Sequence, residues 1–154
     1  MADAFPSRFA GPGESPGFLL WQVANRWQRR VREALAEEEF THVQFVLLAS
    51  LAWLARAGAS ATQAELARHA GTDVMMTSQV VRALEARGLL ERARHPDDAR
   101  ARALTLTNAG RERVVRALPR VEAADLEFFA AAGDGGAAIL PHLRALLAAD
   151  EGRG

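Results

Sequence analysis

The sequence predicts a mainly α fold that carries one small β-hairpin next to a helix-turn-helix. Three observations support this prediction. Apolar residues recur at helical spacing over long segments at both ends of the chain. Two short helical segments joined by a glycine turn lie between these ends. Two runs of strand character, with turn-forming residues between them, follow the second short segment.

The chain begins with a segment that lacks helical periodicity. Met1 to Gly17 holds three prolines and three glycines, and it has no apolar stretch that would form a signal peptide. Residues 1–15 are therefore expected to be a flexible arm. The most apolar run of the chain, Val43 to Ala55, is far shorter than the roughly 20 residues of a membrane span. No contact with a membrane is expected.

Residues 16–58 are expected to form two helices that serve dimerisation and the core. Ser15 followed by Pro16 is typical of a helix start, and apolar residues then follow helical spacing. Thr41 can cap a second helix, which is apolar nearly all round and ends at Gly58. A helix of this kind belongs at the centre of a core.

The helix-turn-helix is predicted from local signals. A T-x-x-E capping box that begins at Thr62 opens a short helix, which stops at Gly71. Thr72 or Asp73 can cap the next helix, which is predicted over Val74 to Arg87.

The hairpin is predicted immediately after these helices. Leu89 to Arg94 has strand character, and Arg102 to Leu106 alternates with a period of two. The turn-forming residues His95 to Asp98 lie between the two runs. Together with the helix-turn-helix, the hairpin completes a winged helix-turn-helix over residues 59–107.

Residues 108–150 are expected to form C-terminal dimerisation helices. Thr107 can cap a long helix that runs toward Ala132 with a bend near Pro119. A glycine-rich segment interrupts it before a last helix over about Ala137 to Ala149. The outer helices carry apolar stripes larger than one small core can cover, which predicts an obligate homodimer.

The chain is neutral overall, but its charge is unevenly distributed. All 19 basic residues are arginines. Residues 68–116 hold ten arginines against six acidic residues, whereas residues 117–154 hold three against six. The planar arginine fork pairs with phosphate or with guanine edges, although an all-arginine set also fits a biased genomic base composition. The positive excess lies over the helix-turn-helix and the hairpin.

The absence of cysteine excludes several kinds of site. Without cysteine there is no disulfide, thiolate nucleophile, thiol redox switch or sulfur-liganded zinc. The four histidines are scattered along the sequence without the local spacing of metal ligands, so neither a metal nor another cofactor is expected. This composition favours a cytoplasmic protein.

The helix predicted over residues 74–87 has two different faces. Its inward stripe consists of Thr77, Val80, Val81 and Leu84. The opposite face then carries Met75, Ser78, Gln79 and Arg82. A helix fits the major groove of DNA, where glutamine pairs with adenine and arginine with guanine or phosphate. An ordinary solvated face is the alternative interpretation.

Arginines cluster around the predicted hairpin turn. They are Arg92, Arg94, Arg100 and Arg102. An arginine at a hairpin tip can enter a narrow minor groove, and Arg100 is the candidate for this role. Asp98 can orient the Arg100 guanidinium, or it can bond its own backbone within the turn.

Several short motifs follow one another between residues 62 and 110. They are Met76-Thr77, Leu84-Glu85, Gly88-Leu89-Leu90-Glu91-Arg92, Asp98-x-Arg100 and Leu104-Thr105-Leu106-Thr107-Asn108-Ala109-Gly110. In this order they resemble the MarR family of winged-helix regulators, and the resemblance extends from about Pro16 onward. Thr62 and Thr77 lie in this stretch and complete the set of candidates for DNA contact.

The resemblance implies a homodimer that binds a pseudo-palindromic operator with two recognition helices in successive major grooves. It implies that Arg100 probes the minor groove with Asp98 as its partner. It also implies a repressor that releases DNA when a small aromatic or phenolic ligand enters a cleft near the dimerisation helices. Trp21, Asn25 and His42 are the candidates for that cleft. In the alternative interpretation, Trp21 packs at a dimer interface and His42 is a capping or surface residue.

Two other functions are weighed against this one. Gly13 to Gly17 matches the G-x-S-x-G pattern of serine hydrolases, but no strand precedes Ser15, and a role as helix cap accounts for this serine. No enzymatic activity and no catalytic residue are expected. A winged-helix module for protein interaction, with solvated arginines and no DNA binding, is the remaining alternative.

Overall fold

The computed structural model describes residues 6–94 and 102–151, with side chains described as far as residue 149. The helices and strands within these ranges are α1 (Pro16–Ala34), α2 (His42–Arg56), α3 (Gln63–Ala70), α4 (Val74–Ala86), β1 (Leu90–Arg94), β2 (Arg102–Leu106), α5 (Asn108–Phe129) and α6 (Leu140–Glu151). Short 3-10 turns lie at Pro12–Glu14, Ala36–Glu38, Ala130–Ala132 and Asp134–Gly136. This element order confirms the predicted fold class.

The predicted caps account for the helix starts. The hydroxyls of Ser15 and Thr107 accept hydrogen bonds from backbone N–H groups in the first turns of α1 and α5, at 3.4 and 3.0 Å. Thr41 and Thr62 each form a capping box. Of the two candidates for the cap of α4, Asp73 is the one used, since its carboxylate accepts from two N–H groups at 2.9 and 3.0 Å.

The C-terminal helices differ from the prediction in their boundaries. α5 ends at Phe129 rather than near Ala132, and it continues through Pro119 as one helix. The last helix begins at Leu140, later than the predicted Ala137. Three glycines in the intervening segment have positive φ, so tight turns replace regular helix there.

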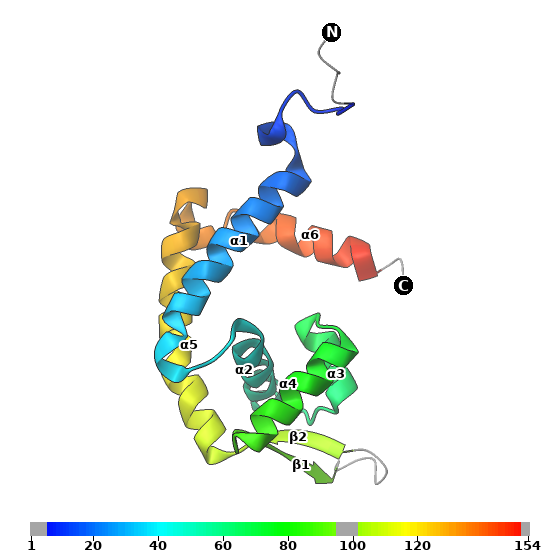
Figure 1. Ribbon diagram of the computed structural model, residues 1–154, viewed down its shortest axis with the longest axis vertical. Coiled ribbons are helices and arrows are strands. Elements are labelled where there is room, and N and C mark those ends of the chain that lie inside the picture. Colours follow the sequence, from blue (N-terminus) through cyan, green and yellow to red (C-terminus); the bar gives the residue numbers. More distant parts are fainter. Residues whose placement is uncertain (1–5, 95–101, 152–154) are drawn as a thin grey trace.

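The structure has two parts, a lobe and an outer part that contains α1 and α6, and α5 belongs to both (Figure 1). α1 and α5 lie side by side. α2, α3, α4 and the hairpin form a lobe at one end of α5, and α6 extends from its other end. The N-terminal part of α1 and α6 project away from the lobe.

α2 lies at the centre of the core and packs against α1, α3, α4, α5 and β2. Its buried side chains are Phe45, Leu47, Leu48 and Leu51. They meet the buried side chains Val31, Leu35, Leu66, Val81, Leu84, Leu90, Leu104, Val114 and Ala117 from the surrounding elements. One continuous apolar cluster therefore joins the two parts of the molecule.

The hairpin is anchored on this core. β1 and β2 pair antiparallel, beginning with Leu90 opposite Leu106. The Leu104 N–H also donates to the Ala61 carbonyl oxygen (2.8 Å), which ties β2 to the segment before α3. Both Leu90 and Leu104 are buried, so the base of the hairpin is fixed on the core.

α5 starts against the backbone of Leu89, where only glycine fits. A Cβ atom on Gly110 would lie 1.9 Å from the Leu89 carbonyl oxygen. The Thr107 N–H donates to this oxygen (3.2 Å), and the Thr107 hydroxyl donates to the Gly88 carbonyl oxygen (2.7 Å). The turn after α4, the residue before β1 and the start of α5 are therefore joined at one point.

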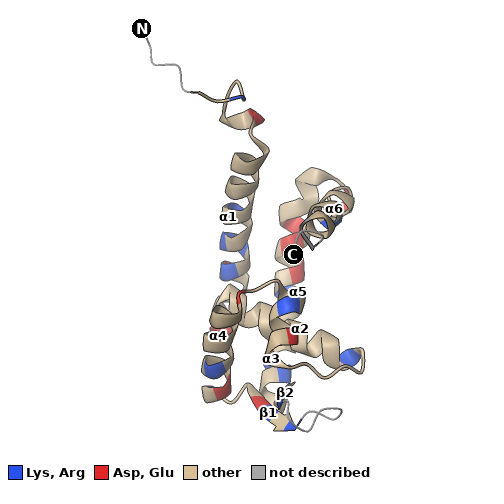
Figure 2. Cartoon of the chain, turned by 90° about the vertical axis from the view of Figure 1, so that its right-hand side faces the viewer, with Lys and Arg blue, Asp and Glu red and all other residues tan. Residues whose placement is uncertain are grey.

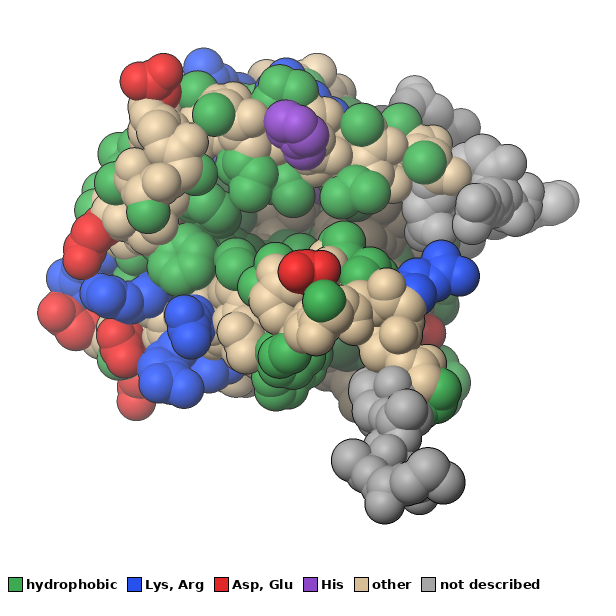
Figure 3. Space-filling view, turned by 90° about the horizontal axis from the view of Figure 1, so that it is seen from above, with side chains coloured by type: hydrophobic (Ala, Val, Ile, Leu, Met, Phe, Trp, Pro, Cys, Tyr) green, Lys and Arg blue, Asp and Glu red, His purple; other side chains and the backbone are tan. Residues whose placement is uncertain are grey.

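Large apolar side chains are exposed on the part that projects from the lobe. They are Phe18, Leu19, Leu20, Trp21 and Val23 on α1 and Leu140, Leu146 and Leu147 on α6. Figure 3 views the molecule from this end, and hydrophobic side chains occupy much of the face that it shows. An exposed apolar surface of this extent is typical of a protein interface. None of the described helices is both long and apolar enough to cross a membrane.

Three glutamates follow α1, and the structure buries one of them. Glu38 is only 5% exposed. Arg116 donates to both of its carboxylate oxygens (2.9 and 3.1 Å), and Arg113 donates to one of them (3.4 Å). The hydrogen bonds from Arg116 outweigh the effect of burial, so the pKa of Glu38 is lowered. The acidic run is therefore part of the link between α1 and α5.

Replacing this buried carboxylate should destabilise the fold. We expect Glu38→Gln to lower the free energy of unfolding by roughly 1–3 kcal/mol at neutral pH, because charge-assisted hydrogen bonds become weaker. The folded-state pKa of Glu38 is lowered, so its contribution is complete above the ordinary value of 4.5 and is lost as the pH falls through the folded value. Denaturant unfolding at several pH values should show that the free energies of unfolding of the parent protein and of Glu38→Gln become equal as the pH is lowered.

The matched control is Glu37→Gln, which alters an exposed ion pair with Arg120. Exposed pairs contribute little, so this variant should keep the parent stability. Equal losses in both variants, or a difference that does not change with pH, would contradict the role of Glu38.

Candidate nucleic-acid interface

α4 has one buried and one exposed face, as the spacing predicts. Thr77, Val81 and Leu84 are buried, and Val80 is partly buried. On the opposite side, Met75 is 75% exposed, Gln79 and Arg82 are exposed, and Ser78 is half-buried. This face presents an amide, a guanidinium, a hydroxyl and a thioether, which are groups that can meet the edges of bases.

The prediction that Thr77 contacts DNA is wrong. Its side chain is fully buried. Its hydroxyl donates to the Asp73 carbonyl oxygen (2.7 Å) and lies 2.8 Å from the Thr72 hydroxyl. Thr77 therefore fixes the turn between α3 and α4 from the inside, and it positions α4 instead of contacting a partner.

Thr62 is engaged at the start of α3. Its hydroxyl donates to the Glu65 carboxylate (2.8 Å) and accepts from the Glu65 N–H (3.3 Å). The residue is partly buried, so its contact with DNA stays a prediction.

The hairpin carries arginines at the end of the molecule away from the termini (Figure 2). Arg94 and Arg102 are both exposed, and they lie opposite each other across the two strands. Like charges in this arrangement repel, so a polyanion close to them would be favoured. Asp98 and Arg100 lie outside the described residues, and their roles at the tip stay predictions.

Arg92 is held by its neighbours at the base of the hairpin. Its Nε donates to the Glu85 carboxylate of α4 (3.1 Å), and its Nη2 donates to the side-chain oxygen of Gln63 on α3 (3.4 Å). Arg92 therefore links β1 to both helices of the helix-turn-helix, a positioning role that sequence reasoning missed. Its contact with DNA stays a prediction.

The three ligand candidates have different surroundings. Trp21 is 64% exposed and stacks with Phe18, with 6.3 Å between the ring centroids. The Asn25 side chain donates to the Trp21 carbonyl oxygen (2.8 Å) within α1. His42 lies against Trp27, with centroids 5.0 Å apart, and burial lowers its pKa. A role for these residues in ligand binding stays a prediction.

A cavity of about 480 Å³ lies between α2 and α5. Its apolar walls come from Phe45, Val46, Ala49, Ala52, Trp53, Val114 and Leu118, and its polar groups from Ser50, Arg56, His69 and Glu122. The Arg56 guanidinium lies 5.5 Å from the centre of the Trp53 ring. Apolar walls with a few polar groups are typical of small-molecule sites. Sequence reasoning missed this cavity because a helix that is apolar all round does not show which part stays uncovered.

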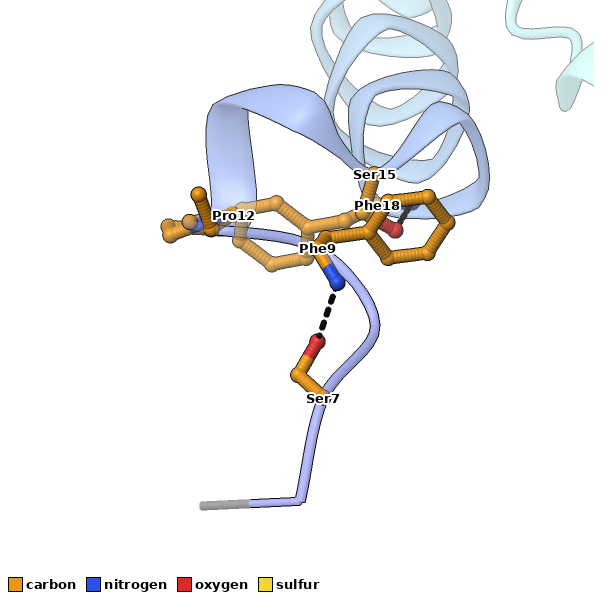
Figure 4. Close-up of a pocket in the computed structure, with 7 residues that line it drawn as sticks. Ser7, Phe9, Pro12, Ser15 and Phe18 are labelled. Atoms are coloured by element: carbon orange, nitrogen blue, oxygen red, sulfur yellow. Dashed lines mark hydrogen bonds between the residues drawn. The ribbon is translucent and has the colours of Figure 1, made fainter. Parts of the chain in front are cut away.

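Another cavity, of about 510 Å³, lies at the start of α1. Phe9, Pro12 and Phe18 surround it, together with the hydroxyls of Ser7 and Ser15 (Figure 4). None of the described residues that line it has a charged side chain, so it offers less than the α2–α5 cavity for recognising a polar group. Ser15 accepts a hydrogen bond from the Phe18 N–H here, which confirms its role as a helix cap.

Comparison with known sequences places this arrangement among transcription regulators. The model of the MarR family matches residues 40–101. A protein of Bacillus subtilis (strain 168) named "Uncharacterized HTH-type transcriptional regulator YdcH" is 52% identical over 126 residues. The match covers 82% of this chain and 86% of that protein.

Solved structures show the same fold. CouR from Rhodococcus jostii RHA1, bound to p-coumaroyl-CoA, has a TM-score of 0.77 and 26% identity, with 90% of this chain and 93% of that chain covered. The transcriptional repressor CouR bound to a 23-mer DNA duplex has a TM-score of 0.74 and 28% identity, with 88% and 94% covered. Both matches therefore cover most of this chain and most of the relative.

Mutation should distinguish the residues of α4 that read bases from Arg92, which does not. We expect Gln79→Ala and Arg82→Ala to change which duplex sequences are bound, with a loss of about 1–3 kcal/mol at the base that each one reads. Arg92→Ala should weaken binding evenly across sequences, because Arg92 links β1 to α3 and α4 and reads no base in this assignment. Binding measured over a library of duplexes tests this, with Arg144→Ala on α6 as the control. Identical preference profiles for all variants would contradict the assignment of the α4 face.

Proposed function

Because this chain belongs to the MarR family, we propose that it is a homodimeric transcription regulator that represses its targets by binding pseudo-palindromic duplex DNA. In this proposal α4 is the recognition helix and lies in the major groove, and the hairpin reaches the adjacent minor groove. A small ligand releases the protein from DNA.

The exposed face of α4 is the observation that carries this proposal. Gln79 and Arg82 are exposed there, one turn apart, with Met75 at the start of the helix. Glutamine and arginine can each form paired hydrogen bonds with a base edge, and an apolar side chain can contact a thymine methyl group. The buried side of the same helix is fixed by Thr77, Val81 and Leu84, so the polar face is presented in one orientation.

The charges on the exposed face of α4 and on the hairpin support binding to a polyanion. In the part of the chain that the structure describes, no carboxylate lies within ion-pair distance of Arg82, Arg94 or Arg102. Uncompensated arginines near an exposed helix favour phosphate, which the planar guanidinium binds well. The relative whose structure was solved with a DNA duplex shares the fold over most of both chains.

The exposed apolar surface supports the homodimer. The uncovered side chains of α1 and α6 lie on the projecting part of the molecule, away from α4 and the hairpin. Association through this part would leave both DNA-binding lobes accessible. Two lobes related by a two-fold axis match a two-fold symmetric DNA site.

The α2–α5 cavity is the best candidate for the ligand. Its volume of about 480 Å³ falls within the usual range for small-molecule sites, roughly 300–1,000 Å³. Trp53 and Leu118 offer apolar contact, while Arg56 and His69 can meet an anionic or hydrogen-bonding group. A small apolar acid, aromatic or phenolic, fits this combination.

We expect the protein to enrich two-fold symmetric sites from a random duplex library. Its affinity for an enriched site should fall steeply between low and moderate salt, because phosphate contacts release counterions. Titration of a labelled duplex at several salt concentrations measures this. A protein that enriches no motif, or whose affinity does not change with salt, would instead fit the winged-helix module for protein interaction.

Filling the cavity should abolish the response to ligand. We expect a small aromatic acid that lowers DNA affinity in the parent protein to have no such effect in Leu118→Trp, because the indole occupies the ligand space. Fluorescence anisotropy of a labelled duplex measures the release. Val115→Trp, on the exposed side of the same helix, is the matched control and should still respond. An undiminished response in Leu118→Trp would exclude this cavity as the ligand site.

A further inference from the structure

The segment between α1 and α2 contacts α5 and the end of α4 at the same time. On the α5 side, the Arg113 Nη2 donates to the Glu38 carbonyl oxygen (2.8 Å). On the α4 side, the Nη1 of Arg87 donates to the Glu39 carbonyl oxygen (3.2 Å). Glu39 has a left-handed backbone with φ of 53°, which turns the chain between these two contacts.

Both arginines contact the Phe40 ring. The Arg113 guanidinium is 5.2 Å from the centre of its ring, and the Arg87 guanidinium is 5.4 Å from the same centre. Both distances are within the range of cation–π attraction. Phe40 itself is 6% exposed, so the core holds the ring in place. We refer to Phe40, Arg87 and Arg113 as the Phe40 clasp.

Arg87 is fixed by more than the ring. Its Nη1 also donates to the side-chain oxygen of Gln44 (3.1 Å), and this oxygen accepts from the Thr41 N–H (3.1 Å) in the capping box of α2. Arg87 is the C-cap residue of α4. Three separate contacts therefore fix the end of α4 to the segment before α2 and to the first turn of α2.

The clasp bridges two helices that share α2 as a neighbour but have few direct contacts with each other. α4 packs mainly against α2 and α3, whereas α5 packs mainly against α1 and α2. The angle between α4 and α5 therefore depends on α2 and on residues that link the two helices. The clasp links α4 to α5 at the C-terminal end of α4, whereas Asp73 caps its N-terminal end.

We propose that the Phe40 clasp fixes the orientation of α4 relative to α5, and that Arg87 is thereby a positioning residue for DNA binding. The second part rests on the proposed function. In a dimer, the orientation of each α4 on its α5 determines whether both recognition helices fit successive major grooves. Arg87 then acts through the helix and makes no contact with DNA.

The first experiment compares Arg87→Ala with Arg120→Ala on a duplex enriched by the parent protein. Arg120 is the matched control, because it also joins α5 to the same segment, through an ion pair with Glu37, but does not contact Phe40. We expect Arg87→Ala to bind about three- to tenfold more weakly, from the loss of cation–π and hydrogen-bond contacts. Arg120→Ala should keep the parent affinity.

The salt dependence separates positioning from direct contact. If Arg87 acts by position, the slope of log affinity against log salt stays at the parent value. A slope smaller by about one would identify Arg87 as a phosphate contact and overturn the proposal. Parent affinity in Arg87→Ala, or an equal loss in Arg120→Ala, would also overturn it. Thermal unfolding of each variant verifies that it is folded.

The second experiment does not depend on DNA. The natural chain has no cysteine, so Ala83→Cys on α4 and Val115→Cys on α5 give two specific spin-label sites, both exposed. Dilution with unlabelled protein restricts pulsed-dipolar distances to pairs within one chain. We expect a narrow distance distribution in the labelled parent and with Arg120→Ala, and a broader or shifted one with Arg87→Ala.

The two experiments can fail separately. A parent protein that binds no duplex would refute the proposed function, while the distance distributions would still decide whether the clasp holds α4. An unchanged distribution in Arg87→Ala would refute the clasp, even if the parent binds DNA tightly.

Discussion

Burial of α2 is the interaction that holds the rest of the structure together. This helix is enclosed by elements from the N-terminal, middle and C-terminal parts of the chain, and its Phe45, Leu47, Leu48 and Leu51 are all buried. At about 1.5–3 kcal/mol for each large apolar side chain, this burial is among the largest single contributions to stability. The polar elements that surround α2, including α4 and the hairpin, take their positions from it.

The second organising feature is the way in which the acidic and basic residues are paired. The sequence shows ten arginines between residues 68 and 116, which suggested a broad basic surface. In the structure, Arg113 and Arg116 bind the acidic segment after α1, and Arg92 pairs with Glu85. The arginines left for a partner are therefore fewer than the count implies, and in the described residues they include Arg82 on α4 and Arg94 and Arg102 on the hairpin strands. Pairing inside the fold makes the positive surface smaller and better defined.

Local features of the fold were predictable from the sequence. Ser15, Thr41, Thr62 and Thr107 cap the helices as expected, because a cap depends on residues only three positions apart. The two faces of α4 were also predictable, since one helical period determines both. The start of α6 was not, because glycines with positive φ permit several turn geometries.

Features that depend on distant residues were not predictable. Glu38 belongs to a run of three glutamates, a pattern typical of a solvated surface, and only the packing of α5 against it explains its burial. Likewise, Trp21 and His42 are predicted candidates for one ligand cleft, and the structure gives them different aromatic neighbours. The α2–α5 cavity is formed by residues far apart in the sequence, so no local pattern indicates it.

The close approach of Gly110 to Leu89 limits how the DNA-binding lobe can move. At this point the backbone of α5 touches the residue before β1, and Thr107 bonds both Leu89 and Gly88. The hairpin cannot tilt away from α5 unless these contacts break together. The lobe therefore has no hinge at this junction. A rotation of α5 would carry the base of the hairpin with it as one rigid body.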